Sequence, residues 1–381
     1  MKIAVLGTRG IPANYGGFET CAEQLAQRWT AGGHDVLVYA RRQRYKDRPA
    51  TVGRTRMRYT RSFERFGMGT PSAAFLSAAD LIALRRDYRY VHLYNTGNAF
   101  LLPLLRLFGF RAVISVDGIE WRREKWGWLQ KAAHRFGAWL AVKFAHAVVA
   151  DNRSVTEFYA AEFGCQAATI AYGAQPIQRS ADADEILARF GLTAGRYCIF
   201  IGRMVPEKGV QRLIDAFERL NTDLSLVIIG DDAPTPYRDA IWARKSDRIR
   251  LLGFQYGHVC EQLLVNAKMY VSASMLEGTS PALLSAMSAG VCCLVNGIPE
   301  NRHTTAGSVA LFEENDAQSL VRTWQALLDD PQRLASVAAS GQAHQRQHYD
   351  WDKIADEYLQ LFQHVERRRS DAVGNPMGRP E

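Results

Sequence analysis

Short apolar runs alternate with segments of helical periodicity in this chain, and this alternation occurs twice. In the first half, the apolar run Lys2–Leu6 is followed by apolar residues at helical spacing up to Gly32 and then by a second run, Asp35–Ala40. Such alternation predicts parallel β-α-β units. Three more runs in this half predict strands, namely Tyr90–Leu93, Ala112–Val116 and Ala147–Ala150. The sequence therefore predicts an α/β fold with an open, doubly wound sheet in the first half.

The stretch Tyr172–Asp182 interrupts the pattern with Gly, Pro and polar residues, and the alternation then restarts. A linker of this composition separates domains, and 381 residues exceed one ordinary core. We therefore expect a first Rossmann-like domain at 1–172 and a second at 183–345. A final helix at 350–369 is expected to return to the first domain. The predicted strands of the second half are Tyr197–Ile201, Leu224–Ile229, Ile249–Leu252, Met269–Ser272 and Val291–Val295.

Composition narrows the class of protein. Hydrophobic residues make up 47% and charged residues 23%, as in globular proteins, and no apolar run approaches the ~20 residues that span a bilayer. The six cysteines show no metal-site spacing. The formal net charge of +8 fits a nucleic acid, an anionic membrane surface or a phosphate-bearing substrate. No nucleic-acid recognition motif is present, so nucleic acid is not expected as a partner.

The first strand ends at Gly7, and the following loop leads to Tyr15-Gly16-Gly17-Phe18-Glu19 at the start of a helix. Helix N-termini present free N–H groups, and glycine permits close approach of a phosphate or sugar. The loop lacks the G-x-G-x-x-G spacing of dinucleotide sites. It is either a nucleotide-sugar or acceptor contact, with Tyr15 and Glu19 toward the acceptor, or an ordinary strand-to-helix turn.

The segment Phe200–Gly209 carries two cations between a strand and a helix. Arg203 follows Gly202 directly, and Lys208 lies five residues further on. A guanidinium fork and a compact ammonium at this spacing can hold the two phosphates of a diphosphate.

A third loop follows the strand Met269–Ser272. Glu277 precedes Gly278, Thr279 and Ser280 stand at helix N-cap positions, and Pro281 suits the first helical turn. The N–H groups of this turn can face a phosphate, while Glu277 can accept hydrogen bonds from sugar hydroxyls.

These motifs, YGGFE, FIGRMVPEKG and EGTSPALLSAMSAG, occur in the order found in the family-four glycosyltransferases of GT-B fold, and the chain resembles that family over nearly its whole length. The resemblance implies two Rossmann-like domains and a nucleotide-diphosphate sugar, linked to dTDP, UDP or GDP, held mainly by the second. Arg203 and Lys208 match the family's diphosphate-binding pair, and Glu277 matches the first glutamate of its E-x7-E motif. Ser285 stands in place of the second glutamate, which usually holds the ribose.

The sequence is also similar to a bacterial subgroup that includes rhamnosyltransferases of cell-surface polysaccharide assembly. This similarity lies in three segments, namely 1–20 (MKIAVLGTRGIPANYGGFET), 117–123 (DGIEWRR) and 295–302 (VNGIPENR). The resemblance implies transfer with retention, without a metal or other cofactor. Asp231 and Asp232 could suggest a metal site, but two adjacent acids after a strand more often form a turn. Asp117 ends a strand and is expected to orient the donor sugar or the acceptor hydroxyl, or else to cap the next helix, and Glu120 is a further acceptor-side candidate.

The segment Trp121–Phe144 predicts an amphipathic helix with basic residues on and beside its polar face. A basic helix with Trp residues can rest on an anionic membrane, which suits a lipid-linked saccharide acceptor, or it can pack on the core with a solvated basic side. The expected location is the cytoplasm, peripherally on the inner face of the cell membrane. The apolar stripe of this helix comprises Trp126, Leu129, Ala133, Phe136, Leu140 and Phe144.

Other functions are weighed against the transferase. A nucleotide-sugar epimerase of the same fold would need a pair of acids that is not visible here, and an NAD enzyme would need the glycine fingerprint. A degenerate nucleotide-sugar-binding or scaffolding member is favoured by Ser285 alone.

Overall fold

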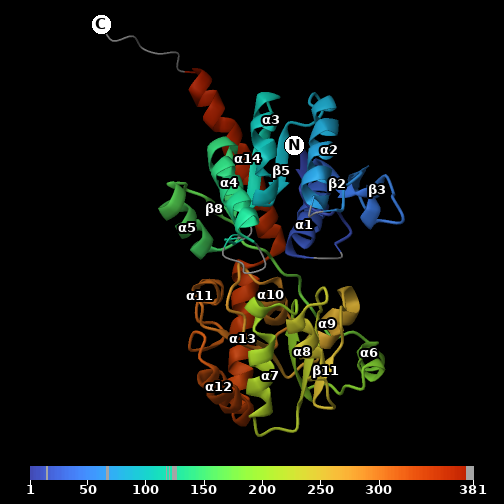
Figure 1. The fold of residues 1–381 in the computed structure, drawn as a ribbon, viewed down its shortest axis with the longest axis vertical. Helices are drawn as coiled ribbons and strands as arrows, with labels where there is room; N and C mark the ends of the chain where they lie inside the picture. Colours follow the sequence, from blue (N-terminus) through green and yellow to red (C-terminus); the bar gives the residue numbers. More distant parts are fainter. Residues whose placement is uncertain (14–15, 66–67, 117, 120, 122–126, 375–381) are drawn as a thin grey trace. The chain divides into compact units, whose positions relative to one another are not determined.

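The computed structural model describes the chain except for residues 14–15, 66–67, 117, 120, 122–126 and 375–381. The chain forms two compact units (Figure 1). Unit 1 comprises Met1–Tyr172 together with Trp351–Glu381, and unit 2 comprises Gly173–Asp350. Within the described residues, no helix is both long and apolar enough to cross a membrane.

Unit 1 is built on an eight-stranded sheet in the order β3-β4-β2-β1-β5-β6-β7-β8. Neighbouring strands run parallel, except that β3 and β4 form an antiparallel edge. The central strand β1 places Ile3 beside Val36 of β2 and Tyr90 of β5. The strands are β1 (Lys2–Leu6), β2 (Asp35–Arg41), β3 (Thr51–Val52), β4 (Thr55–Thr60), β5 (Tyr90–Tyr94), β6 (Arg111–Val116), β7 (Ala147–Ala150) and β8 (Ala168–Thr169).

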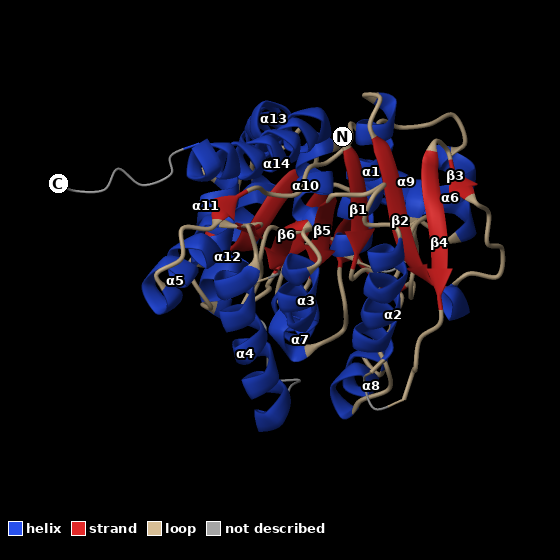
Figure 2. Ribbon diagram, turned by 90° about the horizontal axis from the view of Figure 1, so that it is seen from above, coloured by secondary structure: helices blue, strands red, loops and turns tan. Residues whose placement is uncertain are grey.

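Helices cover both faces of this sheet (Figure 2). The core on one face joins alternate strand residues to Ala74, Leu101, Leu105 and Ala138 from four of the helical segments. These four are α2 (Gly69–Ala83), η2 (Thr96–Leu101), α3 (Leu102–Leu107) and α4 (Trp128–Phe144). The other face carries α1 (Gly17–Ala31) and α14 (Trp351–Gly374); the remaining segments are η1 (Arg42–Arg44) and α5 (Arg153–Phe163).

The last helix, α14, packs on α1 and on the sheet of unit 1. The indole N–H of Trp29 donates to the carbonyl of Ala355 at 3.1 Å, and the hydroxyls of Ser115 and Tyr358 lie 3.0 Å apart. His92 lies under this helix, 2.7 Å from the Ser115 hydroxyl, and burial lowers its pKa to about 3. The His92 ring is therefore a neutral part of the core.

Unit 2 is built on a six-stranded parallel sheet in the order β11-β10-β9-β12-β13-β14. Its strands read as continuous apolar runs because a parallel sheet is buried on both faces. The strands are β9 (Tyr197–Ile201), β10 (Ser225–Ile229), β11 (Ile249–Leu251), β12 (Met269–Ser272), β13 (Cys292–Asn296) and β14 (Ala310–Phe312).

The helices of unit 2 likewise pack on both faces of their sheet. Phe217 of α7 and Trp324 of α12 pack against one face, while the Tyr197 hydroxyl donates to the carbonyl of Leu263 in α9 from the other. The two doubly wound parallel sheets confirm the predicted α/β fold class. The helical segments are α6 (Ala183–Arg189), η4 (Pro206–Lys208), α7 (Val210–Glu218), α8 (Pro236–Trp242), α9 (Gly257–Val265), α10 (Pro281–Ser288), α11 (Pro299–Thr305), α12 (Ala317–Asp329) and α13 (Pro331–His348).

Candidate functional site

The sheet of unit 2 reverses its direction of growth between β9 and β12. The chain runs from β9 to β10 and β11 on one side, and then returns to place β12 on the other side of β9. Doubly wound sheets bind ligands at such a switch point, beyond the carboxyl ends of the strands. Arg203 and Lys208 follow β9, and Glu277 follows β12. The structure therefore brings these three predicted residues to one switch point.

Lys208 and Glu277 form an ion pair at this edge. The Lys208 ammonium donates to both carboxylate oxygens of Glu277 at 2.6 Å. The side chains are 20% and 9% exposed, respectively. A nearly buried carboxylate requires such a partner, because an unpaired charge in this environment is costly. This ion pair thus links the loop after β9 to the loop after β12.

Backbone contacts hold the same two loops together. The N–H of Met275 donates to the carbonyl of Glu207 at 2.8 Å. Gly209 has φ +64°, and a Cβ at this position would lie 2.3 Å from the carbonyl oxygen of Ala273. A glycine is required here both by the left-handed backbone and by the close approach of the second loop. Lys208 therefore stands on a tightly fixed turn.

Arg203 lies beside the loop that follows β10. Its guanidinium Nη1 is 3.9 Å from Oδ2 of Asp232, which exceeds hydrogen-bond distance. Its side chain is 33% exposed. Gly202 contacts the backbone of Gly230 so closely that a Cβ on Gly230 would lie 2.0 Å from the Gly202 carbonyl oxygen. Arg203 is therefore positioned by its backbone, with a guanidinium that can bind an anion.

Asp231 and Asp232 were interpreted as a turn, and Asp231 is engaged in holding the following helix. Arg238 donates to its two carboxylate oxygens at 2.8 and 2.9 Å, and the indole N–H of Trp242 donates at 3.2 Å. The hydrogen bonds from Arg238 lower the pKa of Asp231. Among the residues described, no group of three or more His, Cys, Asp or Glu side chains is arranged to hold a metal ion.

The N-terminus of α10 completes this edge. The Ser280 hydroxyl accepts a hydrogen bond from the N–H of Leu283 at 3.5 Å, and Pro281 is the first helical residue. Thr279 and Ser280 are buried, whereas Gly278 is half-buried. Ser285 lies in the second turn of α10 and is also half-buried. Gly278, Thr279 and Ser280 thus lead into α10, and Ser285 lies one turn into the helix.

Tyr270 is a neighbour of this site that sequence reasoning missed. It is fully buried on β12, and burial together with the negative charge of Glu277 raises the pKa of its phenol. The hydroxyl therefore stays protonated and polar beneath the Glu277 loop. A tyrosine inside an apolar strand run carries no sequence signal for such a position.

In unit 1, Glu19 was predicted to face the acceptor, and its carboxylate instead contacts the loop before its own helix. Its carboxylate accepts a hydrogen bond from the N–H of Arg9 at 2.9 Å and is 6% exposed. Burial raises its pKa, and the bond from Arg9 opposes that shift. The neighbouring Gly16 is the extended N-cap of α1, which begins at Gly17. Glu19 therefore folds the loop back onto its own helix.

The acceptor-side candidates Tyr15 and Glu120, and the catalytic candidate Asp117, lie outside the described residues. The switch point of unit 1, between β1 and β5, is nevertheless marked by an unusual backbone. Asn95 follows β5 with φ 73°, and its side chain accepts from the N–H of Gly97 at 2.7 Å. A non-glycine residue in this region is strained and often functional. Sequence reasoning did not single out Asn95.

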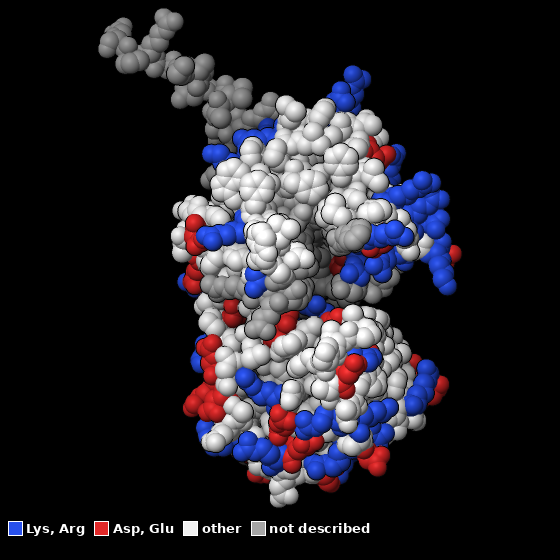
Figure 3. All heavy atoms as spheres, viewed as in Figure 1, with Lys and Arg blue, Asp and Glu red and all other residues white. Residues whose placement is uncertain are grey.

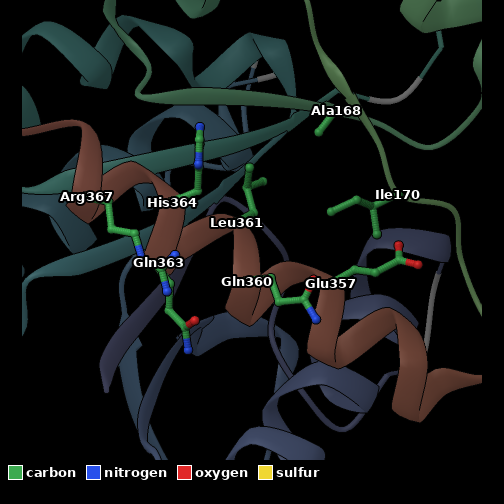
Figure 4. A pocket seen from close by; sticks show the side chains of 8 residues that line it. All are labelled: Ala168, Ile170, Glu357, Gln360, Leu361, Gln363, His364 and Arg367. Atoms are coloured by element: carbon green, nitrogen blue, oxygen red, sulfur yellow. The ribbon is translucent and has the colours of Figure 1, made fainter.

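A separate groove of about 580 Å³ lies on unit 1 between α14 and the segment that includes β8 (Figure 4). Its lining combines polar and apolar side chains and includes none of the predicted site residues. The residues that line it are Ala168, Ile170, Glu357, Gln360, Leu361, Gln363, His364 and Arg367.

Two family models match the chain, one in each half. Residues 16–173 match the glycosyl transferase 4-like domain, and residues 183–344 match the group 1 glycosyl transferases. Together they leave only a short gap at 174–182 within the matched span.

Individual relatives are distant but consistent. The chain is 24% identical to alpha-maltose-1-phosphate synthase of Mycolicibacterium smegmatis, over 72% of this chain and 78% of that protein. It is 26% identical to O-antigen chain mannosyltransferase B of Escherichia coli, over 46% of this chain and 48% of that protein. The fold is similar to that of Anabaena HepE in complex with UDP-glucose, with a TM-score of 0.77, 17% identity, and coverage of 96% of this chain and 100% of that one.

These matches confirm the family predicted from the motifs, whereas membership of the rhamnosyltransferase subgroup stays a prediction. With both family models matched and a parallel doubly wound sheet in each unit, the chain belongs to the family-four glycosyltransferases of GT-B fold.

Proposed function

We propose that unit 2 binds a nucleoside-diphosphate sugar and that the enzyme transfers its hexosyl group to a saccharide acceptor in surface polysaccharide biosynthesis. The observation that carries this proposal is the meeting of Arg203, Lys208 and Glu277 at the switch point of the second sheet. Two cations suit a diphosphate, and a carboxylate beside them suits sugar hydroxyls.

The donor binds this site by forming hydrogen bonds with both members of the Lys208–Glu277 ion pair. Lys208 turns one of its three N–H donors to a phosphate oxygen while Glu277 accepts from a sugar hydroxyl. Arg203 binds the other phosphate, and the N-terminus of α10 adds a partial positive charge. UDP is supported as carrier by the UDP-glucose complex of the Anabaena neighbour, dTDP-linked L-rhamnose rests on the subgroup resemblance, and GDP is the third candidate.

The proposed acceptor is a lipid-linked saccharide, as the similarity to an O-antigen mannosyltransferase suggests. It would meet unit 1 near Tyr15, Glu19 and Glu120 and place the enzyme peripherally on the inner face of the cell membrane. Because the Glu19 carboxylate is engaged with Arg9, Glu19 contributes by shaping the loop.

The proposed reaction retains the anomeric configuration and requires no metal. The acceptor hydroxyl attacks the anomeric carbon on the face of the leaving group, the bond from that carbon to the phosphate oxygen breaks, and the hydroxyl proton passes to the departing phosphate. Arg203 and Lys208 stabilise the charge that develops on the diphosphate. Asp117 orients the acceptor hydroxyl or the donor sugar.

A second candidate, a degenerate nucleotide-sugar-binding or scaffolding protein, is favoured by Ser285. This residue lies eight positions after Glu277, where the family pattern has a carboxylate. A neutral hydroxyl with one oxygen is a weaker acceptor than a carboxylate, whose two charged oxygens can each accept from a ribose hydroxyl. A weakened hold on the nucleotide would reduce transfer without abolishing binding.

The two candidates are separated by incubating the protein with a panel of UDP-, dTDP- and GDP-sugars and measuring released nucleotide, with and without EDTA. The transferase releases nucleotide from at least one donor in EDTA, and Glu277→Gln loses this activity. Asp117→Asn should abolish release while leaving nucleotide affinity nearly unchanged. Nucleotide binding without release from any donor would favour the scaffold, and inhibition by EDTA would rule out metal independence.

A further inference from the structure

The outer surface of the helical layer formed by α2, η2, α3 and α4 is unusually apolar. Most of the large apolar side chains that the described chain exposes lie on these segments or directly after them. Trp128 is 81% exposed and Leu107 80%. The full set, here called the apolar face, is Phe75, Leu76, Phe100, Leu107, Phe108, Trp128, Leu129, Phe136 and Trp139.

The segments of the apolar face are packed side by side. η2 contacts both α2 and α4, and α3 contacts α4. In Figure 3 this side of unit 1 is a broad area with few charged side chains. Large contiguous apolar patches are rare on monomeric soluble proteins and mark interaction sites.

The helix α4 packs on the core with one side and exposes aromatic residues on the other. Its core-facing side consists of Gly137, Ala138, Leu140 and Ala141, all buried. The larger Phe136 and Trp139 face outward and stack with ring centroids 5.7 Å apart. Leu140 and three small residues therefore make the packing contact, while aromatic residues are turned to the surface.

The charged side chains of η2, α3 and α4 are all cationic, whereas α2 carries one acid, Asp80, which is paired with Arg58. The sequence has no Asp or Glu within Thr96–Leu107 or Trp128–Phe144. Arg106, Arg135 and Lys143 are exposed and Lys131 is half-buried, and among these Arg135 is paired with Glu162 of α5. A two-fold contact between two copies would bring the same patch against itself, cations included. The complementary partner is therefore apolar and anionic.

We propose that this face docks on a bilayer of anionic lipids, with the aromatic side chains in the interface and the cations against the headgroups. Tryptophan and phenylalanine enter the headgroup region with a favourable free energy, and lysine and arginine add attraction to anionic lipid. This inference rests on the peripheral location proposed above and names the surface that provides it. Its failure would leave the proposed donor site untouched, because no residue of the apolar face belongs to unit 2.

The test uses the full chain and sedimentation with two kinds of vesicle, phosphatidylcholine alone and phosphatidylcholine with a third of phosphatidylglycerol. The wild type should bind the anionic vesicles preferentially. Phe136→Ala with Trp139→Ala should weaken this binding roughly tenfold or more, since two large apolar groups no longer enter the interface. Lys131→Gln with Lys143→Gln should weaken binding roughly tenfold or more on anionic vesicles and little on neutral ones.

Unit 2 offers a matched control. Phe254 and Tyr256 are each 51% exposed and stack with centroids 5.9 Å apart, so Phe254→Ala with Tyr256→Ala removes an equivalent aromatic pair from the other unit. This control should leave vesicle binding unchanged.

Trp128→Ala is a second test variant on the apolar face. Because Trp128 is the most exposed side chain of the face, this change carries little risk to folding, and thermal melting verifies that the variant is folded.

Vesicle binding that falls in the α4 variants and persists in the control supports the proposal. It is overturned if the wild type shows no preference for anionic vesicles, or if the α4 variants and the control bind equally. It is also overturned if the α4 variants abolish a concentration-dependent dimer while no vesicle binding is seen, which would assign the face to a second copy.

Discussion

Replacing Lys208 with methionine tests the ion pair at the centre of the proposed donor site. The change keeps most of the side-chain volume but removes the two hydrogen bonds of 2.6 Å that the ammonium donates to Glu277. At that distance and an effective dielectric constant of ~20, the attraction is about 6 kcal/mol before desolvation is subtracted. Breaking a buried pair usually costs ~3–5 kcal/mol.

The Lys208 side chain is 20% exposed and that of Glu277 9%, so water screens part of this interaction. We expect Lys208→Met to lower the free energy of unfolding of unit 2 by about 2–3 kcal/mol. For a domain of this size, that corresponds to a melting temperature lower by roughly 5–10 °C.

The assay is a double-mutant cycle by thermal and urea unfolding without nucleotide. Glu277→Gln alone should cost less than Lys208→Met, because it leaves the more exposed partner unpaired. The double variant should be more stable than the sum of the single effects predicts, by about 1–2 kcal/mol, since no unpaired charge remains. A Lys208→Met protein that melts with the wild type, or strictly additive effects, would refute the ion pair.

Three further predictions concern single positions. Burial raises the pKa of Glu19, so the folded state retains a proton that the unfolded chain releases, and stability falls as pH rises above the ordinary range of a glutamate. Thermal melting should therefore show Glu19→Gln more stable than the wild type near pH 7, with the difference in melting temperature closing towards about pH 4. A difference that does not change with pH would contradict this. Ser285→Glu should tighten nucleoside diphosphate binding roughly tenfold through charge-assisted bonds to the ribose, as measured by calorimetry, and unchanged affinity would show that this position does not meet the nucleotide. Gly209→Ala should lower the free energy of unfolding by about 3 kcal/mol, because its Cβ meets the Ala273 carbonyl. Gly253 is the control, since it has the same φ of +64° but open space around an added Cβ, so Gly253→Ala should cost only about 1 kcal/mol. Equal urea midpoints for the two variants would exclude the clash.

The strands and the donor-site residues could be predicted from the sequence because a buried parallel strand is a short apolar run. Arg203 and Glu277 each follow such a run, so their place at a strand end was foreseeable. The strand order was not, because only tertiary pairing shows that β12 lies beside β9. The Lys208–Glu277 pair therefore emerges from the structure, although both residues were singled out separately.

Other features had weak sequence signals. The helix α8 spans seven residues, too few for helical periodicity to indicate that Arg238 and Trp242 would hold Asp231. The helix at 121–144 was predicted with one apolar stripe, but the structure buries Leu140 and exposes Phe136. Periodicity shows that a helix is apolar, while the packing of its small residues decides which side meets the core.

Calorimetric titration of UDP, dTDP and GDP into the full chain tests the central claim most directly, namely that the strand ends of unit 2 bind a nucleoside diphosphate. At least one of the three should bind, and Arg203→Ala should weaken it tenfold or more. Arg219, an exposed cation at the far end of α7, provides the control, and Arg219→Ala should bind as the wild type does. Binding of none of the three, or equal affinity in the two arginine variants, would contradict the assignment of this site.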